Sequence, residues 1–74
     1  MNYREIITAD PSIMLGKPII KGTRITIELI IKKLSEGLTV EDLLVSYPQL
    51  KKEDVLAALA YTSDVIAKEE IFAA

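Results

Sequence analysis

The sequence predicts a mainly α-helical domain, a three-helix bundle of the helix-turn-helix type preceded by a short N-terminal β-arm or hairpin. Apolar residues recur at helical spacing in three segments after residue 26. Residues 1–25 instead hold short β-branched runs broken by glycine and proline. At 74 residues the chain is expected to form one domain, with the β-arm in 1–25 and the bundle in 26–74.

The arm is predicted from two β-branched runs. The run R-E-I-I-T (4–8) predicts a first strand, which Asp10 and Pro11 end, and the pair I-I (19–20) predicts a second. Gly16 and Gly22 are predicted as turn residues, Gly22 because a turn here requires a positive φ.

The first helix follows directly, with Thr26 placed to cap its start and Gly37 to end it. Its apolar stripe has spacings of three and four residues and consists of Ile27, Ile30, Ile31, Leu34 and Leu38. Leu29 falls on the opposite face among charged residues, so we expect the arm or a second subunit to cover it.

The second helix begins after Thr39, which forms a capping box with Asp42, and the chain turns at Pro48. A third helix is expected over 53–68, with Lys52 in the cap position. Its predicted buried face consists of Val55, Leu56, Ala58, Leu59, Thr62 and Ile66. Its predicted outer face consists of Asp54, Ala57, Ala60, Tyr61, Asp64 and Lys68. A short helix, a tight turn and a longer helix are typical of helix-turn-helix units.

The amino-acid composition limits the classes of function that we expect of this chain. With no Cys and no His, the chain has no thiol nucleophile, imidazole base or Cys/His metal site, so we expect no enzyme, no catalytic residues, no cofactor, no metal and no small-molecule substrate. Half the residues are apolar, which favours a partner surface, most simply a homodimer. The N-terminus lacks a signal-peptide core, and no apolar run could cross a membrane, so a cytoplasmic protein is expected.

The stretch G-K-P-I-I-K-G-T-R-I (16–25) has three interpretations: a phosphate-binding loop, a nucleic-acid arm or a structural turn. A Walker A loop requires Lys and then Ser or Thr after its second glycine, whereas Thr23 follows Gly22 here. Residues 1–25 carry net charge +2 and residues 26–74 carry −4. The basic residues of the arm therefore either contact DNA phosphates or pair with the acidic helices.

The candidate site residues fall into two groups. Expected DNA-phosphate contacts are Lys17, Lys21 and Arg24 in the arm, with Lys51 and Lys52 at the start of the third helix. Two aspartates on the predicted outer face of that helix would repel phosphate, and the helix has no Arg, Asn or Gln for base contacts. Expected protein contacts are Leu29, Ile71 and Phe72.

Three segments resemble the domain of unknown function 433 family: D-P-S-I-M-L-G-K-P-I-I-K-G-T-R-I-T-I, E-G-L-T-V-E-D-L-L and Y-P-Q-L-K-K-E-D-V-L-A-A-L-A-Y. The resemblance spans about residues 4–61. It implies a prokaryotic, homeodomain-like helical domain with a β-arm, often dimeric. It also implies an antitoxin-like role beside a PIN-like ribonuclease. The sequence departs from the family at Leu15, where many members carry a second glycine.

Residues and resemblance together lead to two functional hypotheses. The first is a small dimeric antitoxin-like regulator of a type II toxin–antitoxin pair, which binds its own operator DNA and a PIN-like toxin. The alternative is a protein-interaction module that binds a neighbour-encoded partner without contacting DNA. Salt dependence separates them, because phosphate contacts weaken steeply as salt rises.

Overall fold

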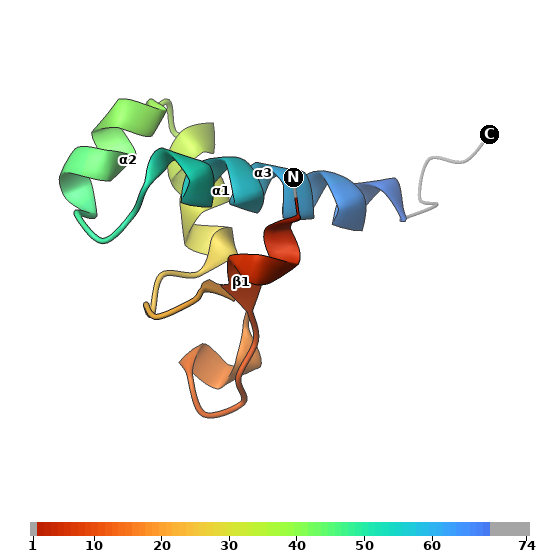
Figure 1. The fold of residues 1–74 in the computed structure, drawn as a ribbon. Coiled ribbons are helices and arrows are strands. Elements are labelled where there is room, and N and C mark those ends of the chain that lie inside the picture. The colour runs from red at the N-terminus through yellow and green to blue at the C-terminus, as the bar shows by residue number, and fades with distance from the viewer. Residues whose placement is uncertain (1, 69–74) are drawn as a thin grey trace.

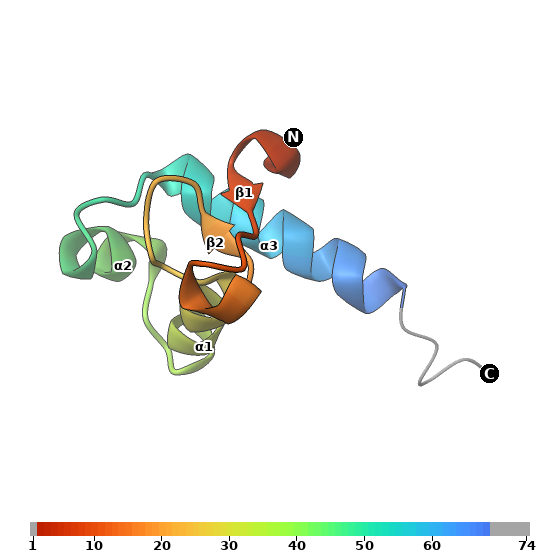
Figure 2. The same cartoon turned by 90° about the horizontal axis from the view of Figure 1, so that it is seen from below.

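The computed structural model describes residues 2–68. It contains three helices and one short antiparallel sheet of two strands near the N-terminus (Figure 1), so the predicted mainly helical fold with a β-arm is confirmed. The helices are α1 (Ile27–Ser35), α2 (Val40–Ser46) and α3 (Lys52–Ala67). Seen from below in Figure 2, α3 is the long helix against which the arm, α1 and α2 gather.

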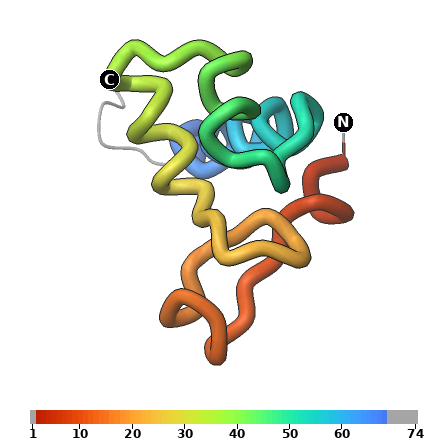
Figure 3. The backbone as a smooth tube through the Cα atoms, turned by 90° about the vertical axis from the view of Figure 1, so that its left-hand side faces the viewer, coloured from red at the N-terminus to blue at the C-terminus, as the bar shows by residue number. Residues whose placement is uncertain are grey.

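The arm contains strands β1 (Ile7–Thr8) and β2 (Ile19–Ile20), with Ile7 opposite Ile20 and Thr8 opposite Ile19. The second strand was predicted correctly, but the first is shorter than the predicted 4–8. Residues Tyr3–Glu5 form a 3-10 turn (η1) instead, because the side chain of Asn2 accepts a hydrogen bond from the Arg4 N–H at 3.1 Å. Figure 3 shows the arm as a layer on one side of the helices.

The connection between the strands contains a second 3-10 turn, η2 (Met14–Gly16). All three of its residues have positive φ: 50° at Met14, 59° at Leu15 and 80° at Gly16. Gly16 therefore has the turn role that the sequence predicts. Leu15 adopts a conformation that glycine adopts without strain, at the position where the family resemblance expects a glycine.

The arm continues into α1 without a linker. A bridge pairs Ile19 with Thr26, and the Ile27 N–H donates to the Pro18 carbonyl at 3.0 Å. The Thr26 hydroxyl accepts from the Leu29 N–H at 3.0 Å, so the predicted cap is confirmed. Gly37, with φ of 99°, ends the helix as predicted.

The α2 and α3 helices begin with acidic residues that bind backbone N–H groups. The predicted capping box of α2 is present, since Thr39 and Asp42 exchange hydrogen bonds at 2.9 and 3.1 Å. The expected cap at Lys52 is wrong: α3 begins at Lys52 and Lys51 is its cap. The Asp54 carboxylate accepts a hydrogen bond from the Lys51 N–H at 2.9 Å. Lys51 is therefore the cap, and the helix begins one residue earlier in the sequence than predicted.

The hydrophobic core joins the arm to all three helices. Four large side chains are almost completely buried: Ile19, Ile30, Leu43 and Val55. Around them lie Ile7, Ile20, Ile25, Ile27, Leu50, Ala57 and Ala58. Because β2 contributes Ile19 and Ile20 to this core, the β-arm is an integral layer of the domain.

The predicted faces of α3 are correct for buried Val55 and Ala58 and for exposed Asp64 and Lys68, but wrong for five other residues. Asp54 and Ala57, assigned to the outer face, are buried, whereas Leu56, Leu59 and Ile66, assigned to the core, are 41%, 42% and 61% exposed. The sequence could not fix the phase, because residues 55–63 contain no charged residue to mark a solvent side. The structure buries Ala57 and Ala58, whose small side chains allow neighbouring elements to approach the helix closely.

Candidate nucleic-acid interface

The turn between β2 and α1 presents two basic side chains on a hydrogen-bonded frame. Its ends are joined by the Ile20 N–H donating to the Ile25 carbonyl at 3.0 Å. The Thr23 hydroxyl donates to the Ile20 carbonyl at 2.8 Å and accepts from the Ile25 N–H at 3.0 Å. Gly22 has φ of 77°, as the turn prediction requires. Lys21 and Arg24 are exposed, while Ile20 and Ile25 anchor the turn in the core.

The start of α3 presents the second pair of basic side chains. Lys51 and Lys52 are exposed, and Leu50 beside them is buried. The Asp54 carboxyl is only 9% exposed and accepts the Lys51 backbone N–H. This aspartate therefore caps the start of α3, and its negative charge stays beside Lys51.

The fold brings these two segments together. Lys21 and Lys51 line one depression of about 240 Å³ with Thr23, Gln49 and three acidic residues, Glu5, Glu53 and Asp54. Arg24 lines the adjoining depression, which shares Thr23 and Gln49 with the first. We call Lys21, Arg24, Lys51 and Lys52, with Gln49 between them, the basic end. In Figures 1 and 3 the β2–α1 turn lies beside the α2–α3 turn.

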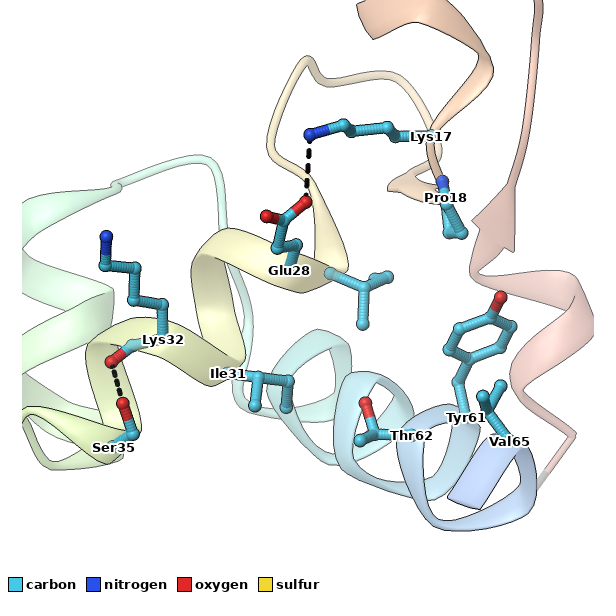
Figure 4. Close-up of a pocket in the computed structure, with 10 residues that line it drawn as sticks. Lys17, Pro18, Glu28, Ile31, Lys32, Ser35, Tyr61, Thr62 and Val65 are labelled. Atoms are coloured by element: carbon cyan, nitrogen blue, oxygen red, sulfur yellow. Dashed lines mark hydrogen bonds and ion pairs between the residues drawn. The ribbon is translucent and has the colours of Figure 1, made fainter. Parts of the chain in front are cut away.

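Lys17 is placed elsewhere. Its ammonium donates to the Glu28 carboxylate at 2.9 Å, on α1 (Figure 4). The hydrogen bond and charge of Lys17 lower the pKa of Glu28. Among residues 2–68, Lys17 is thus the one of the five expected phosphate contacts that has an acidic partner, and it lines a different cavity from the basic end.

That cavity is an open groove of about 530 Å³ between α1 and the second half of α3 (Figure 4). Ile27 and Ile31 from α1 and Tyr61 and Val65 from α3 supply apolar surface to its lining. The Lys17–Glu28 ion pair stands on its rim. Sequence reasoning missed this groove because it assigned several residues of α3 to the wrong face. The absence of charged residues over 55–63 was the sign in the sequence that both faces of this helix are apolar.

The expected protein contacts have different positions. Leu29 is half-buried and packs against the core cluster, and its N–H is held by Thr26. Ile71 and Phe72 lie outside the described residues. The apolar residues that α3 exposes most are Leu56, Leu59 and Ile66, which the sequence had assigned to the core.

The N-terminal η1 turn contacts the second half of α3. The Tyr3 hydroxyl donates to the Asp64 carboxylate at 2.8 Å, and the rings of Tyr3 and Tyr61 meet edge to face with centroids 5.6 Å apart. The hydrogen bond to Asp64 raises the pKa of Tyr3. This contact occupies Asp64, the second aspartate expected to oppose phosphate.

Two further findings concern residues 2–68. Within this range no three His, Cys, Asp or Glu side chains are grouped so that they could hold a metal ion. None of the helices in the same range has the length and apolar character needed to traverse a bilayer.

Comparisons with known proteins agree with this architecture. Residues 7–62 match the family described as "Protein of unknown function (DUF433)". A crystal structure of a DUF433 member from Anabaena variabilis superposes with a TM-score of 0.77 at 30% sequence identity, covering 85% of this chain and 66% of that one. An uncharacterized protein from Sinorhizobium fredii is 34% identical over 58 residues, which are 78% of this chain and 26% of that protein. The chain thus spans about a quarter of this curated relative. Since the family match covers most of the chain and includes both strands, α1, α2 and most of α3, the protein belongs to the DUF433 family.

Proposed function

We propose that the protein is a small dimeric helix-turn-helix protein that binds DNA upstream of its own gene and acts as an antitoxin-like regulator beside a PIN-like ribonuclease. We further propose a binding role without catalysis, in the cytoplasm. The observation that carries the DNA-binding proposal is the basic end, where exposed Lys21, Arg24 and Lys51 from two distant segments line two adjoining depressions and exposed Lys52 follows at the start of α3.

The order of the helices supports this proposal. In helix-turn-helix proteins the second helix of the motif enters the major groove with its N-terminal residues first. Here Lys51 and Lys52 stand at the start of α3, and Gln49 is exposed in the turn before it. The lysines suit phosphate contacts, and a glutamine amide can pair with the edge of an adenine.

The number of basic residues sets the expected salt dependence. Four phosphate contacts give a slope of about −3.6 in log affinity against log salt. A rise from ~50 to ~200 mM salt should then weaken binding by each subunit about 100-fold. Glu5, Glu53 and Asp54 line the same depression as Lys21 and Lys51 and reduce the positive field of the basic end. The measured slope of log affinity against log salt should therefore be no steeper than about −3.6.

The experiment is fluorescence anisotropy with DNA from upstream of the gene and a scrambled duplex, at low and physiological salt. The test variant combines Lys21→Glu with Arg24→Glu. The control combines Lys32→Glu with Lys33→Glu, which makes the same change in net charge on α1, away from the basic end. We expect the first variant to lose binding and the control to retain it. Equal affinity in both variants, or no binding by the wild type at either salt, would overturn the proposal.

A second candidate function is a protein-interaction module that does not contact DNA. It is favoured by the apolar residues exposed on α3 and by the apolar groove between α1 and α3. The net charge of −4 over residues 26–74 also suits a ribonuclease whose RNA-binding surface is basic. Copurification with the product of the adjacent gene, insensitive to Lys21→Glu and Arg24→Glu and without DNA binding, would favour this function.

A further inference from the structure

We propose that the outer face of α3 is the surface through which two copies of this chain pair, with their α3 helices antiparallel. The seam consists of Leu56, Leu59, Ser63 and Ile66, flanked by Ala60 and Ala67, and we call it the α3 seam. The inference deepens the dimer of the proposed function and rests on that proposal for the existence of a dimer.

The first observation is that α3 carries apolar residues on both its inner and its outer face between Val55 and Ala60. Residues 55–63 contain no charged side chain. The inner face is buried in the domain through Val55, Ala57 and Ala58. On the outer face Leu56 and Leu59 are 41% and 42% exposed, and Ile66 is 61% exposed. These exposed fractions show that the outer face has no cover within residues 2–68. A helix that is apolar on both faces is normally buried on both, so a cover from outside this range is expected.

The second observation is the spacing of the seam. Its positions are separated by three, four and three residues, which is the repeat that keeps two long helices in continuous contact. Antiparallel pairing sets Leu59 against Ser63 of the second copy and Leu56 against Ile66. At the centre of the pair, Leu59 of each copy thus meets the small Ser63 of the other. Ala60 and Ala67 at the flank allow the two backbones to approach closely.

The charges at the ends of the helix favour the antiparallel arrangement. Exposed Glu53 lies at the start of α3 and exposed Lys68 directly follows its end. Antiparallel helices bring the carboxylate of one copy toward the ammonium of the other, and their dipoles oppose favourably. Parallel helices would instead set Glu53 beside Glu53 of the second copy and Lys68 beside Lys68, so that like charges meet.

The chemistry of the seam also selects a second copy over the ribonuclease. A basic, RNA-binding partner would be recognised by carboxylates, and residues 55–63, which hold most of the seam, carry none. Uncharged, apolar surfaces that repeat on both partners are typical of homodimers.

The first test is the oligomeric state by sedimentation equilibrium over a wide range of protein concentration. The wild type should be dimeric. Leu59→Glu should weaken the dimer by about 100-fold or more, because two-fold symmetry buries the introduced charge twice. The matched control is Val45→Glu, which places the same side chain on α2 at a residue that is 81% exposed. It should remain dimeric. Far-UV circular dichroism establishes that both variants are folded. A monomeric wild type, or a folded Leu59→Glu variant that dimerises normally, would overturn the inference.

The second test determines the orientation. The chain has no cysteine, so introduced thiols report only on designed contacts. Leu59→Cys and Ser63→Cys proteins, mixed under oxidising conditions, should form a mixed disulfide. Efficient cross-linking of Leu59→Cys with itself would overturn the antiparallel arrangement. A dimer that fails to bind DNA would refute DNA binding and leave this interface standing. A monomer that binds DNA would refute the dimer and this interface and leave DNA binding standing.

Discussion

Replacing Leu15 by glycine should stabilise this protein. Leu15 has φ of 59°, a left-handed conformation that costs a non-glycine residue about 1–2 kcal/mol. Its side chain is 94% exposed, so its removal forfeits almost no burial. Glycine's greater freedom in the unfolded chain offsets about 0.5–1 kcal/mol of the relief. The net gain in unfolding free energy is therefore about 0.5–1 kcal/mol, or about 4 °C in Tm for a domain of this size.

The assay is urea unfolding followed by circular dichroism, with the m-value checked for constancy. Leu15→Ala is the matched control: it removes the leucine side chain but keeps the strained φ, so its stability should stay near that of the wild type. Gly22→Ala is the reverse substitution. Gly22 has φ of 77°, and an added Cβ would meet nothing within 4 Å, so only backbone strain enters. It should lose about 0.5–1 kcal/mol. If Leu15→Gly were no more stable than Leu15→Ala, the strain argument would be refuted.

Three further predictions concern stability. Thr26→Val removes a cap hydroxyl at a residue that is 6% exposed, so the Leu29 N–H is left without a partner and unfolding free energy should fall by about 1–2 kcal/mol. The same substitution at exposed Thr39 should cost only about 0.5–1 kcal/mol, because water can replace the hydroxyl; equal losses in urea unfolding would contradict this. Leu43→Ala empties a fully buried position and should remove about 3–4 kcal/mol, a large part of the stability expected for 74 residues; a thermal transition near that of the wild type would show that Leu43 is not central to the core. The hydrogen bond from the Thr39 N–H lowers the pKa of Asp42 in the folded state, so its contribution is present above the unfolded pKa and is lost as pH falls through the folded one; Asp42→Asn should flatten the decline in urea midpoint between about pH 5 and pH 2, and an unchanged profile would argue against the linkage.

The candidate interface could be predicted in part. The basic residues and the Gly22 turn are visible in G-K-P-I-I-K-G-T-R-I, and so is the tight turn before α3. Pattern reasoning gave no means to separate Lys17 from Lys21. In the fold, Lys17 binds Glu28, eleven positions away, whereas Lys21 lies near Lys51, thirty positions away. Those neighbours are set by how the arm packs on the helices.

What the sequence determined by itself is local: where helices begin and end, where the chain turns, and the family to which it belongs. Thr26, Gly37 and the Thr39–Asp42 pair act through hydrogen bonds within one helical turn, so each works wherever the helix later packs. Only the tertiary structure decided which face of α3 is buried. With no charge in residues 55–63, either face satisfied the hydrophobic pattern, and the choice was made by the fit of small alanines against the rest of the fold.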